Sequence, residues 1–285
     1  MTTSELGRCR ALLFAAAALF STGGAAIKAT TLTGWQVASF RSGVAGLAVL
    51  LMLPAARRGW SFRSVLVGSA YAVTMILFVQ ANKLTTAANT IFLQSTAPIY
   101  LVILGPWLLR ERNRRRDFLV MAAMGVGLAL FFVGTEQPAS TAPRPFEGNL
   151  LALLSGMSWA LTVMGMRWLG KEGLAEGPSA AVAVVAGNVI TFLFCLPWAL
   201  PVQTAQTTDW LVIVYLGIFQ IGLAYVCLTS ALRHIPALEA SLLLLVEPVL
   251  NPVWAWLVHG ERPGTWALCG SAVILLVTAV KTRFD

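Results

Sequence analysis

The chain alternates between apolar runs of about 20 residues and short clusters of charged residues. An apolar helix of about 20 residues crosses the ~30 Å hydrocarbon core of a bilayer, because each residue adds about 1.5 Å. Only 11% of the 285 residues are charged and the mean hydropathy is +0.77, whereas a soluble domain has about 25% charged residues. A soluble protein with a large core would spread its charges over the whole surface. The sequence therefore predicts an all-α membrane protein.

Ten apolar segments are long enough to be transmembrane helices. They cover residues 10–28, 35–54, 63–82, 87–109, 117–135, 147–168, 179–200, 210–231, 238–258 and 264–282. The first segment follows Arg8 and Arg10 and so resembles a signal peptide. Its apolar run is longer than that of a signal peptide and many spans follow it, so a retained first helix is the favoured interpretation.

Basic residues are distributed unequally between the loops. With the N-terminus in the cytoplasm, fifteen lysines and arginines lie on the cytoplasmic side, and Lys28, Lys83, Arg144 and Arg262 lie outside. Arg41 falls within the second span and belongs to neither group. Cytoplasmic loops carry the excess of basic residues in membrane proteins, so both termini are predicted to be cytoplasmic. Orientation in a lipid bilayer thus explains the net charge of +8, and no nucleic-acid partner is expected.

A polar, proline-rich linker divides the chain near its middle. The linker covers residues 136–147, and it separates a first unit, 1–135, from a second unit, 148–285. Each unit contains five of the predicted spans. Because five is an odd number, the two units are expected to cross the membrane in opposite orientations.

The two units also resemble each other in sequence. With an offset of 150 residues, Pro98 aligns with Pro248 and Glu111 aligns with Glu261. Inverted repeats are typical of secondary transporters, which bind substrate near the middle of the membrane between the repeats. The sequence therefore predicts ten transmembrane helices arranged as two inverted five-helix repeats.

Three prolines and one acid lie inside predicted spans. Pro98 and Pro248 lie near the middle of the fourth and ninth spans, and Pro252 follows four residues after Pro248. Prolines kink helices, and these kinks are expected to face a cavity, the alternative being that they only fit neighbouring helices together. Inserting a charged side chain such as Glu247 at this depth of the membrane costs roughly 2.5–3.5 kcal/mol on insertion scales. Glu247 is interpreted either as a coupling or amino-group-binding carboxylate or as a structural acid bonded to the bent backbone.

Polar and aromatic side chains within the spans are the candidates for a substrate cavity, because such cavities combine apolar walls with a few polar anchors. The candidates are Phe20, Ser21, Tyr71, Thr74, Phe78, Asn82, Asn89, Phe92, Gln94, Ser95, Tyr100, Ser158, Trp159, Thr162, Gln220 and Tyr225. Trp159, Phe78, Phe92, Gln94 and Glu247 are the strongest, because they lie well inside their spans. Each polar candidate has a structural alternative, since such side chains also hydrogen-bond membrane helices to each other.

The sequence contains no recognisable catalytic or metal-binding motif. The four cysteines are isolated, and neither an HExxH nor a GxxxxGK[ST] motif occurs. His234 and His259 lie at opposite membrane faces in the predicted topology, and Asp117 and Asp209 lie at the ends of spans. No cofactor and no metal are expected, and the chain is predicted not to be an enzyme.

The stretch "EPVLNPVWAWLVHGER", residues 247–262, is similar to the EamA-type signature of the drug/metabolite transporter superfamily. The repeats, the prolines in spans four and nine and the Glu-Arg ends of those spans extend the resemblance over nearly the whole chain. Around "NTIFLQSTAPIYLVILGPWLL", residues 89–109, the chain most resembles bacterial aromatic amino-acid exporters. The resemblance implies a single-chain exporter of aromatic or other apolar amino acids in the bacterial inner membrane. A multidrug exporter or a channel-like uniporter of the same fold is the alternative, and an intramembrane enzyme is a weaker one.

Overall fold

The computed structural model describes residues 3–108, 115–133, 138–171, 179–232 and 243–284. The helices are α1 (Thr3–Ser21), α2 (Gly23–Lys28), α3 (Gly34–Met52), α4 (Phe62–Leu84), α5 (Ala87–Gln94), α6 (Ala97–Leu108), α7 (Arg115–Val133), α8 (Pro145–Lys171), α9 (Ser179–Ala199), α10 (Thr207–Tyr215), α11 (Ala224–Leu232), α13 (Val246–His259) and α14 (Thr265–Phe284), with a 3₁₀ turn η1 (Pro54–Arg57) and a π-helix η3 (Leu216–Leu223). Apart from an isolated bridge between Ala139 and Ala142, no strand occurs among the described residues. The predicted all-α class is confirmed for this part of the chain.

Eight helical segments of the described residues are long and apolar enough to cross a membrane. They are Glu5–Lys28, Gly34–Met52, Phe62–Leu84, Ala87–Leu108, Arg115–Val133, Pro145–Met166, Ala180–Ala199 and Thr207–Leu228. These correspond to the first eight predicted spans, although α1 begins at Thr3, before the predicted start. The ninth and tenth spans remain predictions: α13 has 14 residues, and the apolar part of α14, Thr265–Val280, is shorter than a full span.

The fourth and ninth predicted spans are interrupted ahead of their prolines rather than gently bent. The break between α5 and α6 lies at Ser95 and Thr96, and a turn at Leu245 precedes α13. Proline has no N–H to donate four residues back and its ring clashes with that carbonyl, so the helix breaks ahead of Pro98 and Pro248, which lie in the first turns of α6 and α13. With the offset of 150 residues, Ser95 aligns with Leu245, so the two breaks occupy equivalent positions. Pro252 lies inside α13.

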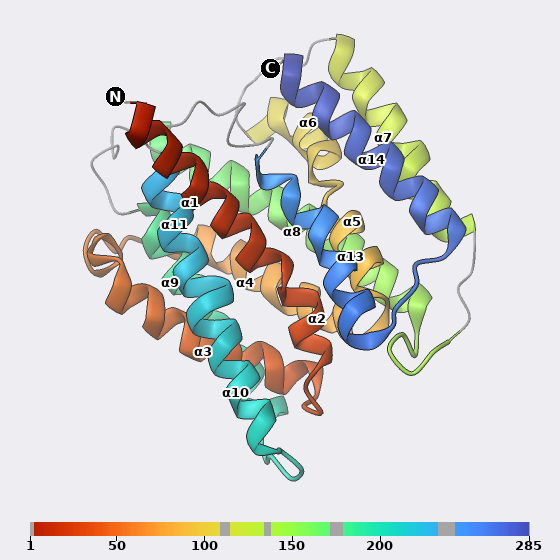
Figure 1. Cartoon of the computed structure of the whole chain (residues 1–285). Coiled ribbons are helices and arrows are strands. Elements are labelled where there is room, and N and C mark those ends of the chain that lie inside the picture. Colours follow the sequence, from red (N-terminus) through yellow and green to blue (C-terminus); the bar gives the residue numbers. More distant parts are fainter. Residues whose placement is uncertain (1–2, 109–114, 134–137, 172–178, 233–242, 285) are drawn as a thin grey trace.

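Helices from the two halves of the chain pack against each other throughout the bundle (Figure 1). The second and seventh predicted spans, α3 and α9, lie side by side, and so do the fifth and tenth, α7 and α14. In addition, α4 packs against α8 and α9, while α1 packs against α11 and α13. The start of α1 and the end of α14 lie at the same end of the bundle, as an even number of spans requires.

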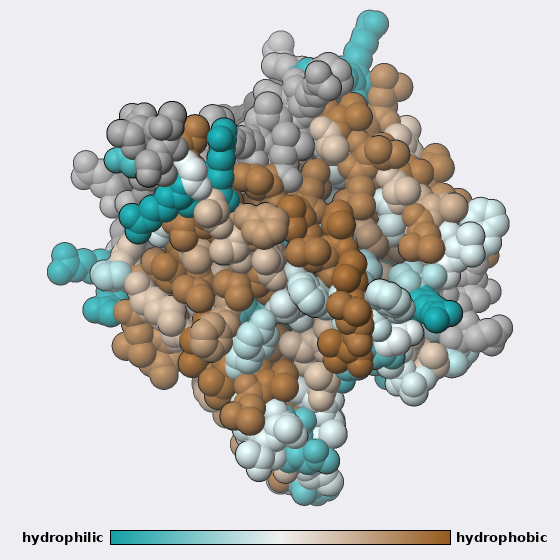
Figure 2. Space-filling view, viewed as in Figure 1, coloured by the Kyte–Doolittle hydropathy of each residue, from teal (hydrophilic) through white to brown (hydrophobic). Residues whose placement is uncertain are grey.

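The outer surface of the bundle is strongly apolar. Figure 2 shows hydrophobic side chains over most of the visible face, with hydrophilic side chains gathered mainly towards its edges. Phe62, Trp107 and Leu119 are each more than 70% exposed. Large apolar surfaces of this kind are rare on soluble proteins, and they suit the hydrocarbon of a bilayer.

Candidate functional site

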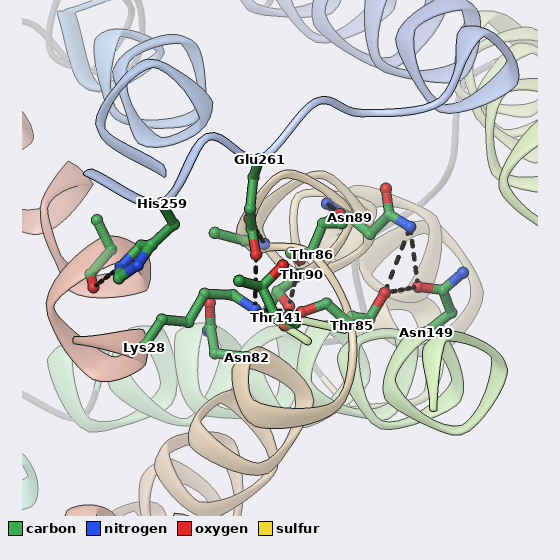
Figure 3. Close-up of polar contacts among 12 residues, drawn as sticks. Lys28, Asn82, Thr85, Thr86, Asn89, Thr90, Thr141, Asn149, His259 and Glu261 are labelled. Carbon is green, nitrogen blue, oxygen red and sulfur yellow. Dashed lines mark hydrogen bonds and ion pairs between the residues drawn. The ribbon is translucent and has the colours of Figure 1, made fainter. Parts of the chain in front are cut away.

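One end of the bundle is held by a buried ion pair between the two halves of the chain. Lys28, the last residue of α2, places its Nζ 2.9 Å from Oε1 of Glu261, and the two side chains are only 4% and 2% exposed. Lys28 Nζ also donates to the backbone carbonyls of Thr85, at 2.7 Å, and Thr141 (Figure 3). The ammonium group therefore has three partners. This region is called the Lys28–Glu261 end below.

Local backbone geometry turns Glu261 into the bundle. Gly260 ends α13 with a φ of 67°, a left-handed conformation that glycine adopts without steric cost. Its N–H donates to the carbonyl of Trp256 at 2.9 Å, and the Glu261 N–H reaches the carbonyl of Ala255 at 3.4 Å. Glu261 Oε2 then accepts the N–H of Ala87 at 2.9 Å, at the start of α5, where the helix dipole favours an anion.

A layer of amides and hydroxyls lies beside the ion pair (Figure 3). Thr85 Oγ1 donates to Asn149 Oδ1 at 2.7 Å, and Asn89 Nδ2 donates to the same oxygen at 3.2 Å. Because Asn149 belongs to α8, these bonds join the α4–α5 junction to the second half of the chain. His259 Nε2 lies 2.8 Å from the carbonyl oxygen of Ala25 and joins α13 to α2. This end of the bundle is thus cross-linked by buried polar contacts between the halves.

Four of the predicted aromatic candidates meet in the interior. Tyr71 on α4 and Tyr225 on α11 are buried in one cluster, and Phe20 on α1 and Trp159 on α8 pack against it. The rings of Phe20 and Tyr225 meet edge to face with centroids 5.4 Å apart, and those of Tyr71 and Tyr225 with centroids 6.2 Å apart. Both halves of the chain contribute to this group, which is called the aromatic cluster below.

The structure adds Arg41, which the sequence analysis did not select, to this cluster. Arg41 lies near the middle of α3 and is 1% exposed. Its guanidinium donates to Met75 Sδ at 3.5 Å and lies within electrostatic range of the hydroxyls of Tyr71 and Tyr225. An arginine in the middle of an apolar segment was itself a signal, because charges at that depth are rare and face the interior of the bundle.

Several other predicted residues fill the core or bond one helix to another. Phe78 and Phe92 are buried in a separate apolar cluster. Thr74 Oγ1 donates to Ser158 Oγ at 3.0 Å and thereby links α4 to α8. Gln94 Nε2 donates to Ser155 Oγ at 2.8 Å. These contacts match the structural alternative, in which hydroxyls and amides join membrane helices.

The remaining hydroxyl and amide candidates mostly bond to nearby backbone. Ser95, Thr162 and Asn82 donate to carbonyls one turn earlier on their own helices, at 2.7, 2.9 and 2.9 Å. Tyr100 donates to the carbonyl of Leu153 on α8 at 3.2 Å. These bonds occupy donors of the side chains, whereas Asn82 Oδ1 has no hydrogen-bond partner among the described residues.

A second set of polar side chains surrounds the break between α1 and α2. Ser21 Oγ accepts the Trp254 indole N–H at 2.9 Å, and Gln220 Nε2 donates to the carbonyl of Phe20 at 3.4 Å. Gln220 lies in the π-helix η3, a distortion that is frequent at functional sites. Asn251, another residue missed by the sequence analysis, is buried beside Gly24, and neither atom of its amide has a hydrogen-bond partner among the described residues.

Glu247 lies in the first turn of α13, where it is half-buried. Its carboxyl group is within electrostatic range of the Tyr225 hydroxyl. It therefore approaches the aromatic cluster from the α13 side, while Arg41 approaches from α3. Pro248, the next residue, is buried.

Metal ligands do not gather anywhere in the part of the chain that the structure describes: no group of three or more His, Cys, Asp or Glu side chains is placed to hold an ion. Cys9, Cys195, Cys227 and Cys269 are all free thiols. The groups that a ligand could meet are therefore aromatic rings, hydroxyls, amides and a few charged side chains. Glu111, which aligns with Glu261, lies outside the described residues.

Comparison with known proteins identifies the family. A model of the EamA-like transporter family matches residues 9–133 and 146–282. The chain belongs to the EamA-like transporter family. It is 30% identical over 269 residues to an uncharacterized protein of Pseudomonas aeruginosa, covering 88% of this chain and 87% of that protein. It is also 27% identical over 206 residues to the uncharacterized transporter YdfC of Bacillus subtilis, covering 71% and 65% of the two chains.

A solved structure shares the fold of this EamA-like protein, with a TM-score of 0.62 and 18% identity over 97% of this chain and 96% of the other. That structure is described only as the crystal structure of a protein. The family and the names of the relatives make the chain a membrane transporter of small molecules rather than an enzyme.

Proposed function

We propose that this EamA-like transporter exports aromatic or other apolar amino acids across the bacterial inner membrane by alternating access, working as a single chain. The observation that carries the proposal is the aromatic cluster, which both halves of the chain build next to a buried charge. Phe20, Tyr71, Trp159 and Tyr225 supply aromatic walls, and cavities for drug-sized or metabolite ligands combine such walls with a few polar anchors.

The inverted-repeat arrangement is supported by three independent observations. The family model matches two successive ranges, 9–133 and 146–282, which fit units of 1–135 and 148–285 joined by the linker 136–147. The breaks at Ser95 and Leu245 are separated by the same offset as the aligned prolines. The helix pairs α3–α9 and α7–α14 unite spans that the repeat relates to each other. Halves related in this way can rock against each other around a central site.

The Lys28–Glu261 end serves as the outer gate in this proposal. The distribution of basic residues places Lys28 and Glu261 on the outside, and their buried pair joins the two halves. The described conformation is therefore the one that is closed towards the outside. Export requires the pair to separate, so that the substrate bound at the aromatic cluster can leave.

Counterflow in proteoliposomes tests the proposed function. Vesicles that contain the purified protein and unlabelled phenylalanine are diluted into radiolabelled phenylalanine. Transient accumulation of label indicates a carrier, and linear, non-saturable entry indicates a channel. If neither aromatic nor aliphatic amino acids produce counterflow, whereas lipophilic cations do, the chain is a multidrug exporter of the same fold and the amino-acid proposal is wrong.

Replacing Trp159 with alanine is expected to raise the KM for phenylalanine by about 3- to 10-fold, because an aromatic pair contributes roughly 0.5–1.5 kcal/mol. Initial rates of counterflow over a range of concentrations measure this effect. Trp168→Ala is the matched control, since Trp168 is a partly buried tryptophan on the same helix that packs in a different cluster. Equal effects of the two substitutions would show that Trp159 acts only through packing.

Replacing Glu247 with glutamine is expected to make transport insensitive to an imposed pH gradient, because the amide has the same shape but cannot exchange a proton. The Glu247 carboxyl group approaches the Tyr225 hydroxyl, so protonation of Glu247 changes the electrostatic environment of the aromatic cluster. Flux is measured with the inside of the vesicle acidic, neutral or alkaline. Glu147→Gln, at an exposed position, is the control. A variant that keeps the wild-type pH response would leave Glu247 as a structural acid.

A further inference from the structure

We infer that the Arg41 guanidinium is the anchor for the carboxylate of the transported solute. This inference deepens the proposed function and rests on it. It narrows the substrate class to monocarboxylates that carry an aromatic or apolar body. It excludes amines and lipophilic cations that lack a carboxylate.

The guanidinium of Arg41 is buried without a counterion. The side chain is 1% exposed and lies near the middle of α3. Among the described residues, no carboxylate lies within 4.0 Å of it, and its one hydrogen bond runs to the weak acceptor Met75 Sδ at 3.5 Å. Arg41 Nε has no hydrogen-bond partner. Most of the donors that a guanidinium offers are therefore unused.

A second buried cation, Lys28, shows what a structural charge looks like. Lys28 has a carboxylate at 2.9 Å and two backbone carbonyls as hydrogen-bond acceptors. An isolated charge inside a membrane protein is costly, and charges of this kind are retained where they bind ions or substrates. The contrast with Lys28 indicates that the partner of Arg41 comes from outside the chain.

The side chains around Arg41 can bind the carboxylate and the ammonium group of an amino acid. The hydroxyls of Tyr71 and Tyr225 lie near the guanidinium and can donate to a carboxylate oxygen. Asn188 Nδ2 lies 3.5 Å from the Tyr71 hydroxyl, and Asn188 Oδ1 has no hydrogen-bond partner in the described part of the chain. That oxygen and the Glu247 carboxylate are acceptors for an ammonium group. A guanidinium fork binds the two oxygens of a carboxylate side by side.

The π-helix η3 approaches α3 closely at two glycines. A Cβ on Gly217 of η3 would lie 2.5 Å from Val44 Cγ1, and a Cβ on Gly222 would lie 3.0 Å from Ala48 Cβ. Glycines thus form part of the contact between α3 and η3. Because Arg41 is fully covered in the described conformation, a solute reaches it when these helices separate, as the rocking of two repeats would allow.

Binding of three related ligands to the purified full chain in nanodiscs tests the inference. Phenylalanine has both charged groups, 3-phenylpropionate has only the carboxylate, and phenethylamine has only the ammonium. Calorimetry is expected to detect phenylalanine and 3-phenylpropionate, with phenethylamine at least about 10-fold weaker. Arg41→Met is expected to weaken the two carboxylates by about 10- to 100-fold, as loss of hydrogen bonds to a charged group predicts. Arg41→Lys is expected to weaken them less, because the charge remains and the fork is lost.

Thermal unfolding of the same samples separates binding from a structural role. Arg41→Met is expected to unfold at the wild-type temperature or above it, since it removes an uncompensated buried charge. If Arg41→Met does not fold, Arg41→Lys decides, and unchanged affinity for 3-phenylpropionate would overturn the inference. Counterflow of phenylalanine by wild type together with equal carboxylate affinity in Arg41→Met would overturn the inference and leave the proposed function intact. Strong binding of phenethylamine in place of 3-phenylpropionate would also overturn it.

Discussion

Glu261→Ala is expected to destabilise the folded protein by about 3–5 kcal/mol, because it leaves the Lys28 ammonium buried without a counterion. The side chain of Lys28 is 4% exposed, so water cannot replace the lost carboxylate. The Ala87 N–H at the start of α5 also loses its acceptor. The free energy of unfolding, measured in detergent by heat or denaturant, tests this expectation.

Glu147→Ala is the matched control for this prediction. Glu147 also forms an ion pair at 2.9 Å, with Arg144, but these side chains are 55% and 61% exposed. Exposed pairs contribute about 0–1 kcal/mol, so the control is expected to unfold close to wild type. If both variants lose the same free energy of unfolding, the burial of the Lys28–Glu261 pair does not stabilise the fold.

The double variant Lys28→Met with Glu261→Met distinguishes stability from gating. Replacing a buried ion pair with apolar side chains is often neutral or stabilising, so this variant is expected to fold. A gate must also open, however, and an apolar pair lacks the water-dependent release of an ion pair. We expect the double variant to bind phenylalanine but to transport it slowly, and wild-type transport rates would contradict the assignment of this end as the outer gate.

The chain's helices follow from its sequence because their signal is local. Apolar runs of the right length predicted the first eight spans. The prolines predicted kinks in the fourth and ninth spans, where the structure has breaks at Ser95–Thr96 and a turn at Leu245. Tyr71, Trp159 and Tyr225 of the aromatic cluster were also selected from the sequence, because aromatic rings inside spans are candidate walls of a cavity. What the sequence did not reveal is which of them would meet: Phe78 and Trp159 looked equivalent, yet the fold places them in different clusters.

The charged residues that matter were missed for a different reason. Lys28 and Glu261 were treated as loop charges. They are 233 residues apart in the chain, and only the folded bundle brings them into contact. Arg41 was set aside because it belonged to no loop. Its position alone was informative, since charged side chains in the middle of spans are rare and functional. Sequence patterns report burial, whereas pairing across the bundle depends on tertiary structure.

Gly187→Leu is expected to prevent α4 and α9 from packing and to abolish both stable folding and transport. A Cβ on Gly187 would lie 2.5 Å from Tyr71 Cδ1 and 2.6 Å from the backbone oxygen of Gly68. Glycine at such positions lets membrane helices approach closely, and overpacking costs about 1–3 kcal/mol or more for small additions. Gly187→Ala already introduces the Cβ, so it should lower the unfolding temperature and displace Tyr71 from the aromatic cluster.

Gly125→Ala provides the control for the glycine prediction, because it makes the same change in α7 where nothing lies within 4 Å of the added carbon. It is expected to be neutral or to stabilise by up to about 1 kcal/mol, as alanine does in place of glycine within a helix. Unfolding temperature and phenylalanine counterflow are measured for all three variants. A Gly187→Ala protein as stable as Gly125→Ala would mean that α4 and α9 do not touch through their backbones. In that case Tyr71 would not be fixed by α9, and the aromatic cluster would lose the contact that holds it at the interface of the two halves.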